Sequence, residues 1–370
     1  MKFIFACGGT AGHINPAISI AKELKRLMPD AEILFVGSGR KLENRLVPLE
    51  GFDIVNLTIS GLTRGLSPKS IAENVKAAKK LASSGKEATK ILKDFMPDVV
   101  IGTGGYVCYP VIKNAAKLNI PTVIHESNAV PGLTTKLLSG CASRVLVSFE
   151  NTVQYYKKPE NVILTGTPVR DDFLTADGQV SKRELGANKP LVVSFWGSLG
   201  AGLMNLHMIE FVKQNAEKGR FHHIHATGGG EQGISEFMTG LKNAGVKELP
   251  DYIEIRPYID DMPSVMAAAD IILCRAGAST LAELTLLGKP AILVPSPYVT
   301  NNHQEENAKR LFEAGGVVML KESECSGSVL FDEAARLCAD TERLVKMAEA
   351  QHHAATPDAL KKIIEIILSV

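Results

Sequence analysis

Short apolar runs recur along the chain and alternate with stretches whose apolar positions follow helical spacing. The runs are Phe3–Cys7, Ile33–Val36, Val99–Ile101, Thr122–His125 and Val145–Val147 in the first half, and Leu191–Phe195, His223–Thr227, Ile253–Arg256, Ile271–Cys274 and Ala291–Val294 in the second. Because the runs are continuous rather than alternating, they predict strands that are covered on both faces. This pattern is typical of an α/β protein with parallel sheets and helices on each side.

The two halves of the chain repeat one plan, in which a strand leads into a glycine loop and then into a helix. Residues 8–12 follow the first strand, and residues 197–202 follow the strand that begins at Leu191. We therefore predict two doubly wound domains, 1–165 and 166–346, and expect a C-terminal helix at about 347–370 to pack back on the first. Ligands of such sheets bind beyond the carboxyl ends of the strands, so we expect the site in a cleft at the glycine loops.

Composition narrows the class of protein. A chain of 370 residues is long for one hydrophobic core. Its 45% hydrophobic and 22% charged residues argue against disorder, and a formal net charge of +1 gives no bulk attraction to nucleic acid. The six cysteines lack the Cys-x-x-Cys spacing of redox and metal sites, and no run reaches the roughly 18 apolar residues of a membrane span. We expect a soluble or peripherally bound protein.

The first glycine loop contains a candidate catalytic base. Asn15 and Pro16 are expected to be the N-cap and first residue of a helix, so the loop would present free backbone amides to an anion. His13 lies between loop and helix, where a neutral imidazole could take a proton from an attacking hydroxyl. A histidine that is merely hydrogen-bonded at a loop fits the pattern equally well.

Two further glycine loops are candidates for binding a nucleotide. Residues 197–202 lack the Gly-Lys-Ser/Thr ending of a Walker loop, so they indicate either a seat for a diphosphate or a tight turn. In the loop after Cys274, Ser279 or Thr280 is expected to cap a helix. Glu283, expected in its first turn, is either a capping group or a ligand of ribose hydroxyls.

A polar loop follows the strand 291–294 and contains Gln304 and Asn307, which suit sugar hydroxyls or a solvated helix start. The chain has no Asp-x-Asp motif, and a strand would point His222 and His223 to opposite faces. We therefore predict no metal site and no cofactor, and expect helix termini and backbone amides to stabilise a departing diphosphate.

The order and spacing of these motifs together resemble the MurG family of N-acetylglucosaminyltransferases, which complete the lipid-linked disaccharide-peptide of the bacterial cell wall. The resemblance covers essentially the whole chain. It rests on residues 8–13, 59–62, 102–107, 125–132, 166–170, 197–201, 258–262 and 275–283, and on the loop of Gln304.

The resemblance implies a GT-B fold and an inverting transfer of N-acetylglucosamine from UDP-GlcNAc to the muramoyl 4-hydroxyl of undecaprenyl-pyrophosphoryl-MurNAc-pentapeptide (lipid I to lipid II), at the cytoplasmic face of the cell membrane. It implies His13 and Glu126 as catalytic residues, and Gly104, Gly105 and Tyr106 as acceptor-binding residues. The implied UDP-GlcNAc ligands are Thr10, Ala11, Gly12, Asn128, Arg170, Ser198, Ile259, Ala278, Ser279, Thr280, Leu281, Ala282, Glu283 and Gln304.

Two positions depart from the family pattern. Ala11 replaces a glycine, which would cost roughly 1–2 kcal/mol if that residue needed a positive φ. Leu199 replaces a glutamine and removes one polar contact to the donor. A third feature is the lysine-rich segment 69–93, which is compatible either with a basic amphipathic helix on an anionic membrane or with a solvated helix whose apolar stripe lies in the core.

Four other functions share the expected fold. A glycolipid transferase acting on diacylglycerol would share the donor half, and a UDP-sugar epimerase would need no lipid acceptor. A catalytically silent UDP-sugar sensor would not need His13. A dehydrogenase is disfavoured because neither glycine loop has a full dinucleotide fingerprint.

Overall fold

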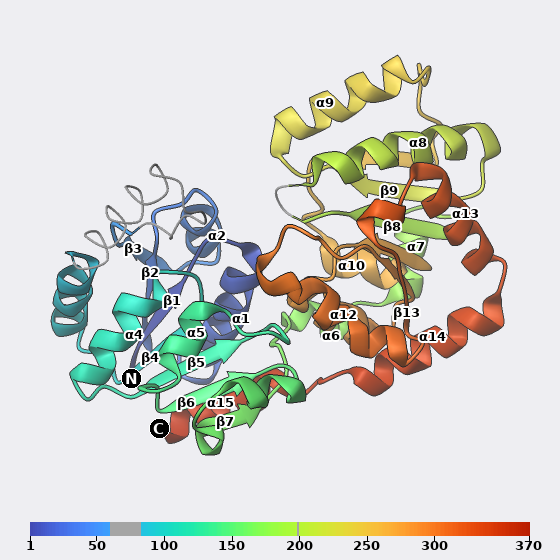
Figure 1. The fold of residues 1–370 in the computed structure, drawn as a ribbon. Helices are drawn as coiled ribbons and strands as arrows, with labels where there is room; N and C mark the ends of the chain where they lie inside the picture. The colour runs from blue at the N-terminus through green and yellow to red at the C-terminus, as the bar shows by residue number, and fades with distance from the viewer. Residues whose placement is uncertain (60–82, 198–199) are drawn as a thin grey trace. The chain divides into compact units, whose positions relative to one another are not determined.

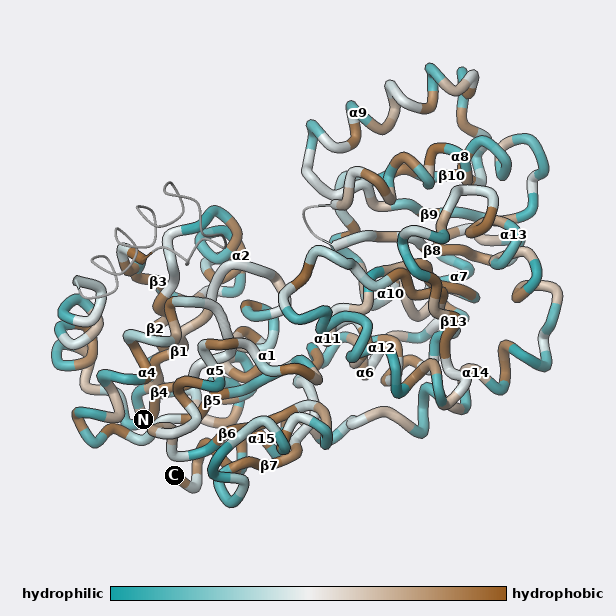
Figure 2. Tube along the Cα trace, in the orientation of Figure 1, coloured by the Kyte–Doolittle hydropathy of each residue, from teal (hydrophilic) through white to brown (hydrophobic). Residues whose placement is uncertain are grey.

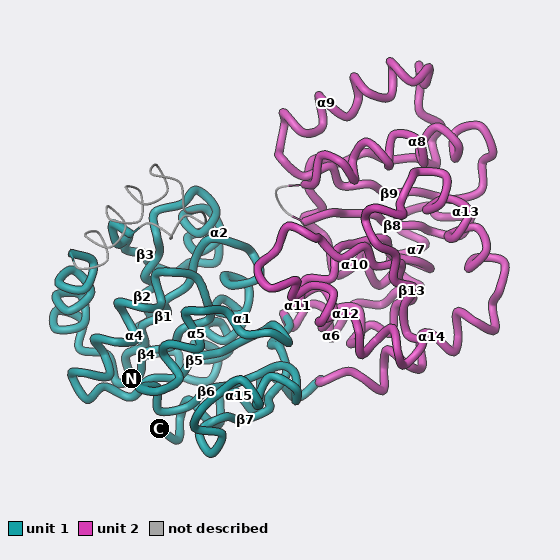
Figure 3. Tube along the Cα trace, viewed as in Figure 1, with its two compact units in different colours: residues 1–169, 357–370 teal, residues 170–356 magenta. Residues whose placement is uncertain are grey.

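The computed structural model describes residues 1–59, 83–197 and 200–370. The chain divides into two compact units, Met1–Val169 with Pro357–Val370, and Arg170–Thr356 (Figure 3). Each unit contains one parallel sheet, which confirms the predicted α/β class with two doubly wound domains. The first boundary lies four residues beyond the predicted one at 165/166.

Unit 1 is built around a seven-stranded sheet in the order β3-β2-β1-β4-β5-β6-β7 (Figure 1). Its strands are β1 Lys2–Cys7, β2 Glu32–Gly37, β3 Asp53–Asn56, β4 Val99–Gly104, β5 Thr122–Glu126, β6 Arg144–Val147 and β7 Val162–Leu164. Its helices are α1 Ala11–Leu27, α2 Glu43–Leu49, a helix at 83–95, α4 Cys108–Lys117, α5 Leu133–Leu138 and α15 Ala359–Ser369, with short 3₁₀ turns at Glu150–Tyr155 and Pro159–Asn161. One buried apolar cluster forms on each face of the sheet.

Unit 2 contains a six-stranded sheet in the order β10-β9-β8-β11-β12-β13. Its strands are β8 Leu191–Phe195, β9 His222–Ala226, β10 Ile253–Arg256, β11 Ile271–Cys274, β12 Ala291–Leu293 and β13 Val317–Met319. The helices are α6 Asp171–Thr175, α7 Gly178–Glu184, α8 Gly202–Lys218, α9 Gly230–Asn243, α10 Met262–Ala268, α11 Ala278–Leu287, α12 His303–Glu313, α13 Gly327–Cys338 and α14 Thr341–Ala354, with 3₁₀ turns η3 Thr300–Asn302 and η4 Glu322–Glu324.

All ten predicted strands are present, and most of their ends lie within two residues of the predicted ends. Figure 2 shows hydrophobic residues concentrated along the strands, and every residue of β8 and β11 is buried. The strands β3, β7 and β13 were not predicted. Each is a sheet edge with exposed or half-exposed positions. The strands β7 and β13 are apolar but only three residues long, and β3 has only two apolar residues.

The C-terminal helix expected to pack on the first domain is α15, Ala359–Ser369, and it is shorter than the predicted range 347–370 because a second helix, α14, ends at Ala354. The sequence from Ala355 to Pro357 separates α14 from α15, and proline disfavours helical conformation in the residue before it. The α14 helix stays with unit 2, where Gln351 Nε2 donates to the carbonyls of Lys289 and Gly316 at 3.1 Å each. Only α15 returns to unit 1, where its isoleucines join the core beneath α1.

Candidate active site

His13 lies in the first turn of α1, which begins at Ala11 after the N-cap Thr10. The prediction that Asn15 and Pro16 start this helix is wrong. The amides of His13 and Ile14 already donate to the Thr10 carbonyl, at 3.1 and 3.2 Å. Ala11 has a helical rather than a positive φ, so alanine costs nothing there. The residue with positive φ in this loop is Gly9, at +94°.

One hydrogen bond fixes the tautomer of His13. Its Nδ1 lies 3.0 Å from the Gly8 carbonyl oxygen. Because a carbonyl can only accept, Nδ1 must carry the proton, and Nε2 is then the basic nitrogen. Within the described residues Nε2 has no hydrogen-bond partner. In the neutral ring the lone pair is therefore on Nε2.

Two glycines at the end of β4 leave room for this ring. Gly104 has φ +128°, and a Cβ there would lie 2.4 Å from His13 Cδ2. Gly105 has φ +92°, and its Cβ would lie 2.5 Å from the Gly8 carbonyl oxygen. Thr103 Oγ1 also donates to the His13 carbonyl at 2.6 Å. The end of β4 thus packs directly against the imidazole, and Tyr106 next to it is half-exposed.

Glu126 ends β5 and is buried with both carboxylate oxygens engaged. Oε1 accepts from the amide and the side-chain nitrogen of Asn128, both at 3.1 Å, and Oε2 accepts from the Gly132 amide at 2.9 Å. This carboxylate organises the loop after β5. Beside it, burial lowers the pKa of His125, whose Nε2 lies 2.9 Å from the Gly166 carbonyl oxygen.

In unit 2, two helix N-termini lie at the same sheet edge, because α8 follows β8 and α11 follows the adjacent β11. Neither N-cap, Ala201 or Gly277, caps its helix with a side chain, so backbone amides are available to an anion. Ser279 and Thr280 lie inside α11, which makes the predicted capping role wrong. The Ser279 hydroxyl oxygen is buried without a hydrogen-bond partner among the described residues.

Glu283 lies in the second turn of α11, beyond reach of the helix start, so the predicted capping alternative is excluded. Burial raises the pKa of Glu283 to about 8, although nearby Arg170 acts in the opposite direction. Arg170 precedes α6, and its Nε lies 3.5 Å from Asp172 Oδ1. Of the other predicted donor ligands, Ala278, Leu281 and Ile259 are buried, and Thr280 and Ala282 are half-buried.

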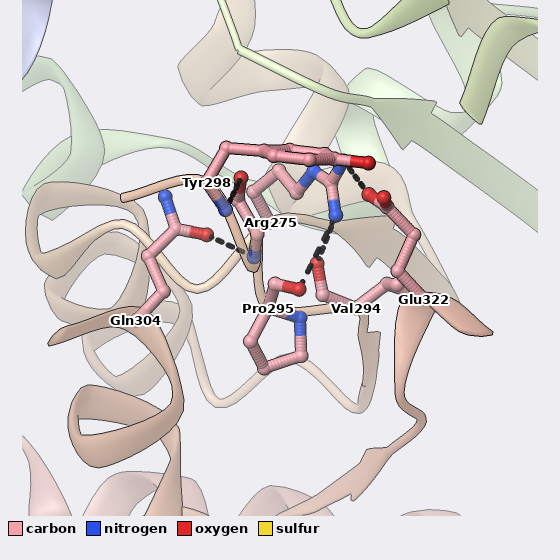
Figure 4. Close-up of polar contacts among 7 residues, drawn as sticks. Arg275, Val294, Pro295, Tyr298, Gln304 and Glu322 are labelled. Atoms are coloured by element: carbon pink, nitrogen blue, oxygen red, sulfur yellow. Dashed lines mark hydrogen bonds and ion pairs between the residues drawn. The ribbon is translucent and has the colours of Figure 1, made fainter. Parts of the chain in front are cut away.

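The loop after β12 is held from two sides (Figure 4). Gln304 Oε1 accepts from the Ser296 amide at 2.8 Å. Arg275 donates to the carbonyls of Val294 and Pro295, at 2.9 and 3.3 Å, and is paired with buried Glu322. Asn307 is fully buried and donates to the Ala276 carbonyl, so it is not placed to meet a sugar as expected.

Sequence reasoning missed Arg275, Glu322 and Glu43 as parts of the site. Glu43 is fully buried near the His13 loop. A charged residue that directly follows a buried strand, as Arg275 does, is a usable signal, whereas nothing in the local pattern distinguishes Glu43. Ser198, Leu199 and most of the segment 69–93 lie outside the described residues.

The two fully buried histidines of β9 share one serine hydroxyl. His223 Nε2 and His225 Nδ1 lie 2.9 and 2.8 Å from the Ser194 hydroxyl oxygen. Within the described part of the chain, no group of three or more His, Cys, Asp or Glu side chains is placed to hold a metal ion.

Comparison with known proteins gives consistent matches over the whole chain. The glycosyltransferase family 28 N-terminal domain matches residues 3–147, and the glycosyltransferase family 28 C-terminal domain matches residues 191–363. A UDP-N-acetylglucosamine–N-acetylmuramyl-(pentapeptide) pyrophosphoryl-undecaprenol N-acetylglucosamine transferase of Acetivibrio thermocellus is 44% identical, across 100% of this chain and 98% of its own. The protein of the same name from Thermoanaerobacter pseudethanolicus is 44% identical across 100% of both chains.

Solved structures with a similar fold include a MurG protein. The crystal structure of MurG from Acinetobacter baumannii has a TM-score of 0.74 and 27% identity, over 100% of this chain and 99% of its own. A UDP-GlcNAc 2-epimerase from Neisseria meningitidis bound to UDP-GlcNAc has a TM-score of 0.68 at 17% identity, over 100% of both chains. The epimerase therefore shares the fold.

Proposed function

The chain belongs to glycosyltransferase family 28, and on that premise we propose how its residues transfer N-acetylglucosamine from UDP-GlcNAc to the muramoyl 4-hydroxyl of lipid-linked MurNAc-pentapeptide. The named relatives at 44% identity support both the donor and the acceptor. The reaction is a single displacement, in which the acceptor hydroxyl attacks the anomeric carbon as UDP departs.

The observation that carries the mechanism is the hydrogen bond between His13 Nδ1 and the Gly8 carbonyl. In the neutral ring this bond leaves the lone pair on Nε2, which has no protein partner within the described residues, so we assign His13 as the general base for the acceptor hydroxyl. A positioned base of this kind contributes typically about 10²–10⁴ in rate. Glu126 contributes by holding the Asn128–Gly132 loop rather than by exchanging protons, because both its oxygens accept hydrogen bonds from that loop.

The donor is held by unit 2 in this proposal. The uncapped N-termini of α8 and α11 supply amides and helix dipoles to the diphosphate, and the orphaned Ser279 hydroxyl supplies a further donor. As the sugar–phosphate bond breaks, negative charge grows on the departing UDP, where such fixed dipoles stabilise it. Glu283 on α11 accepts hydrogen bonds from the ribose hydroxyls.

The test is transfer of radiolabel from UDP-GlcNAc to a short-chain muramoyl-pentapeptide diphospholipid, with diacylglycerol as the competing acceptor. Label in the muramoyl lipid alone is the expected result, and label in diacylglycerol or release of free sugar would overturn the proposal. His13→Ala should reduce kcat at least 100-fold. A variant within threefold of wild type would remove His13 from the mechanism.

We also propose that the surface formed by α4 and α5 faces the membrane that carries the acceptor. No helix among the described residues is long and apolar enough to cross a bilayer. Leu133 and Leu137 of α5 are 60% and 58% exposed, and Leu137 lines a hollow of about 420 Å³ together with Lys113 and Lys117. An exposed apolar group next to two lysines suits an interface with anionic lipid.

Co-sedimentation with vesicles tests this surface. Binding to vesicles that contain anionic lipid, and not to neutral vesicles, is expected for wild type and should be lost in the double variant Lys113→Glu and Lys117→Glu. The control is Lys361→Glu with Lys362→Glu, the same charge change on exposed positions of α15. If both double variants lost vesicle binding to the same extent, net charge alone would explain the effect, and the proposed α4–α5 surface would be refuted.

A further inference from the structure

Glu43 is the first residue of α2 and is fully buried, yet the mechanism above gives it no role. Its Oε1 accepts from the Ser38 hydroxyl at 2.6 Å and from the Ser38 and Arg40 amides at 3.1 Å each. Its Oε2 accepts from the Gly9 amide at 3.3 Å. A buried carboxylate is costly unless hydrogen bonds compensate for its lost hydration, and here four neutral donors do so.

The protonation state of this group follows from those bonds. Burial acts to raise the pKa of Glu43, but the Ser38 hydroxyl and the amides of Arg40 and Gly9 outweigh it and lower the pKa. Glu43 is therefore a carboxylate at neutral pH, and it can only accept hydrogen bonds.

The Gly9 amide and the Gly8 carbonyl belong to one peptide group. On one side this peptide gives its N–H to Glu43, and on the other side its oxygen takes the proton-bearing Nδ1 of His13, at 3.0 Å. Its orientation therefore decides what His13 Nδ1 meets. If the peptide turned over, an N–H would face Nδ1, the imidazole proton would move to Nε2, and the base would be lost.

Local sterics do little to prevent that rotation. Both residues that flank the peptide are glycines, and Gly9 already has φ +94°, a region open to glycine at little cost. The Glu43 carboxylate is the group that selects one orientation, because it attracts the N–H and repels the carbonyl oxygen. Gly105, where an added Cβ would lie 2.5 Å from the Gly8 oxygen, leaves room for the selected orientation.

We propose that Glu43 is a positioning residue that sets the tautomer of His13 through the Gly8–Gly9 peptide, so that the carboxylate acts on the base without touching it. The inference rests on the proposed role of His13 as general base. Its physical content is an oriented chain of two hydrogen bonds, from His13 to the peptide oxygen and from the peptide N–H to Glu43.

Glu43→Gln tests the proposal, because the side chain keeps its shape while an amide group replaces one acceptor oxygen. In protein labelled with ¹⁵N-histidine at pH 8, the His13 ring signals, assigned by their loss in His13→Ala, should change from the Nδ1–H to the Nε2–H form. The kcat should fall at least 30-fold, with the KM for UDP-GlcNAc within about twofold of wild type. Glu50→Gln, at the other end of α2, removes the same charge from a partly exposed site and should leave both readouts unchanged.

A double variant separates positioning from an independent role. If Glu43 acts only through His13, then Glu43→Gln combined with His13→Ala should be no slower than His13→Ala alone. A further loss of comparable size, or an unchanged tautomer in Glu43→Gln, would overturn the inference. Should Glu43→Gln fail to fold, Ser38→Ala removes the 2.6 Å bond and leaves the carboxylate, and it should give a mixture of the two tautomers. An unmixed Nδ1–H form in Ser38→Ala would also overturn the inference.

The spectroscopic result does not depend on turnover. A wild-type protein that transfers no sugar but shows the tautomer change in Glu43→Gln would refute the proposed function and keep this inference. A wild-type protein that transfers sugar, with an unchanged tautomer in the variant, would do the reverse.

Discussion

Gly104→Ala perturbs the candidate base without altering any polar group. The new Cβ would lie 2.4 Å from His13 Cδ2 and 2.8 Å from Nε2, whereas ordinary contacts begin at 3.4 Å. The imidazole must therefore move by about 1 Å, and a misplacement of that size can reduce turnover by roughly 10²-fold. The φ of +128° adds a conformational cost of roughly 1–3 kcal/mol.

Kinetics and unfolding separate these two effects. We expect kcat to fall about 100-fold, and the melting temperature to fall by about 2–12 °C at 2–4 °C per kcal/mol. The control is Gly51→Ala, where φ is +81° but no atom lies within 4 Å of the added Cβ, so only the melting temperature should fall. If Gly104→Ala raised only the KM for the acceptor, Gly104 would act on the acceptor and the reasoning about His13 would be refuted.

Three further predictions concern unit 2. Burial raises the pKa of Glu283 to about 8, and the proposed contact with UDP requires the ionised side chain. UDP should therefore bind roughly tenfold more tightly at pH 9 than at pH 7, and calorimetry on Glu283→Gln should show no such pH dependence. Burial lowers the pKa of His225 to about 3. The contribution of the neutral histidine to the free energy of unfolding is therefore complete above pH 6.5, and about 2 kcal/mol of it is lost by pH 5. Denaturation of His225→Gln should show a shallower acid loss than the exposed-site control His353→Gln, and equal slopes would contradict it. Arg275→Met leaves Glu322 buried and unpaired, so unfolding should become easier by about 3–5 kcal/mol, partly recovered by adding Glu322→Gln; a melting temperature near wild type would contradict this.

The sequence is most informative where a strand is buried on both faces. The runs at Leu191–Phe195 and Ile271–Cys274 give the exact bounds of β8 and β11, because every position of these central parallel strands is buried and all but Ser194 are apolar. Edge strands are harder to recognise, because β3 has only two apolar residues and β13 is only three residues long. Helix starts were less well predicted. Pro16 and Ser279 suit a first turn and a cap by type, but in each case the helix begins earlier, at a residue with no capping side chain.

The candidate site residues also differ in whether the sequence alone can identify them. His13 can be singled out because it follows a glycine loop directly after a strand, so topology alone takes it to the carboxyl edge of the sheet. Glu43 cannot, because its relation to His13 exists only after β1 and β2 pair and bring the two following loops together. Its side chain acts on a peptide group, and backbone orientation has no signature in residue type beyond the two adjacent glycines. For that reason a residue that sets the chemistry of the base looks, in the sequence, like an ordinary acidic residue at the start of a short helix.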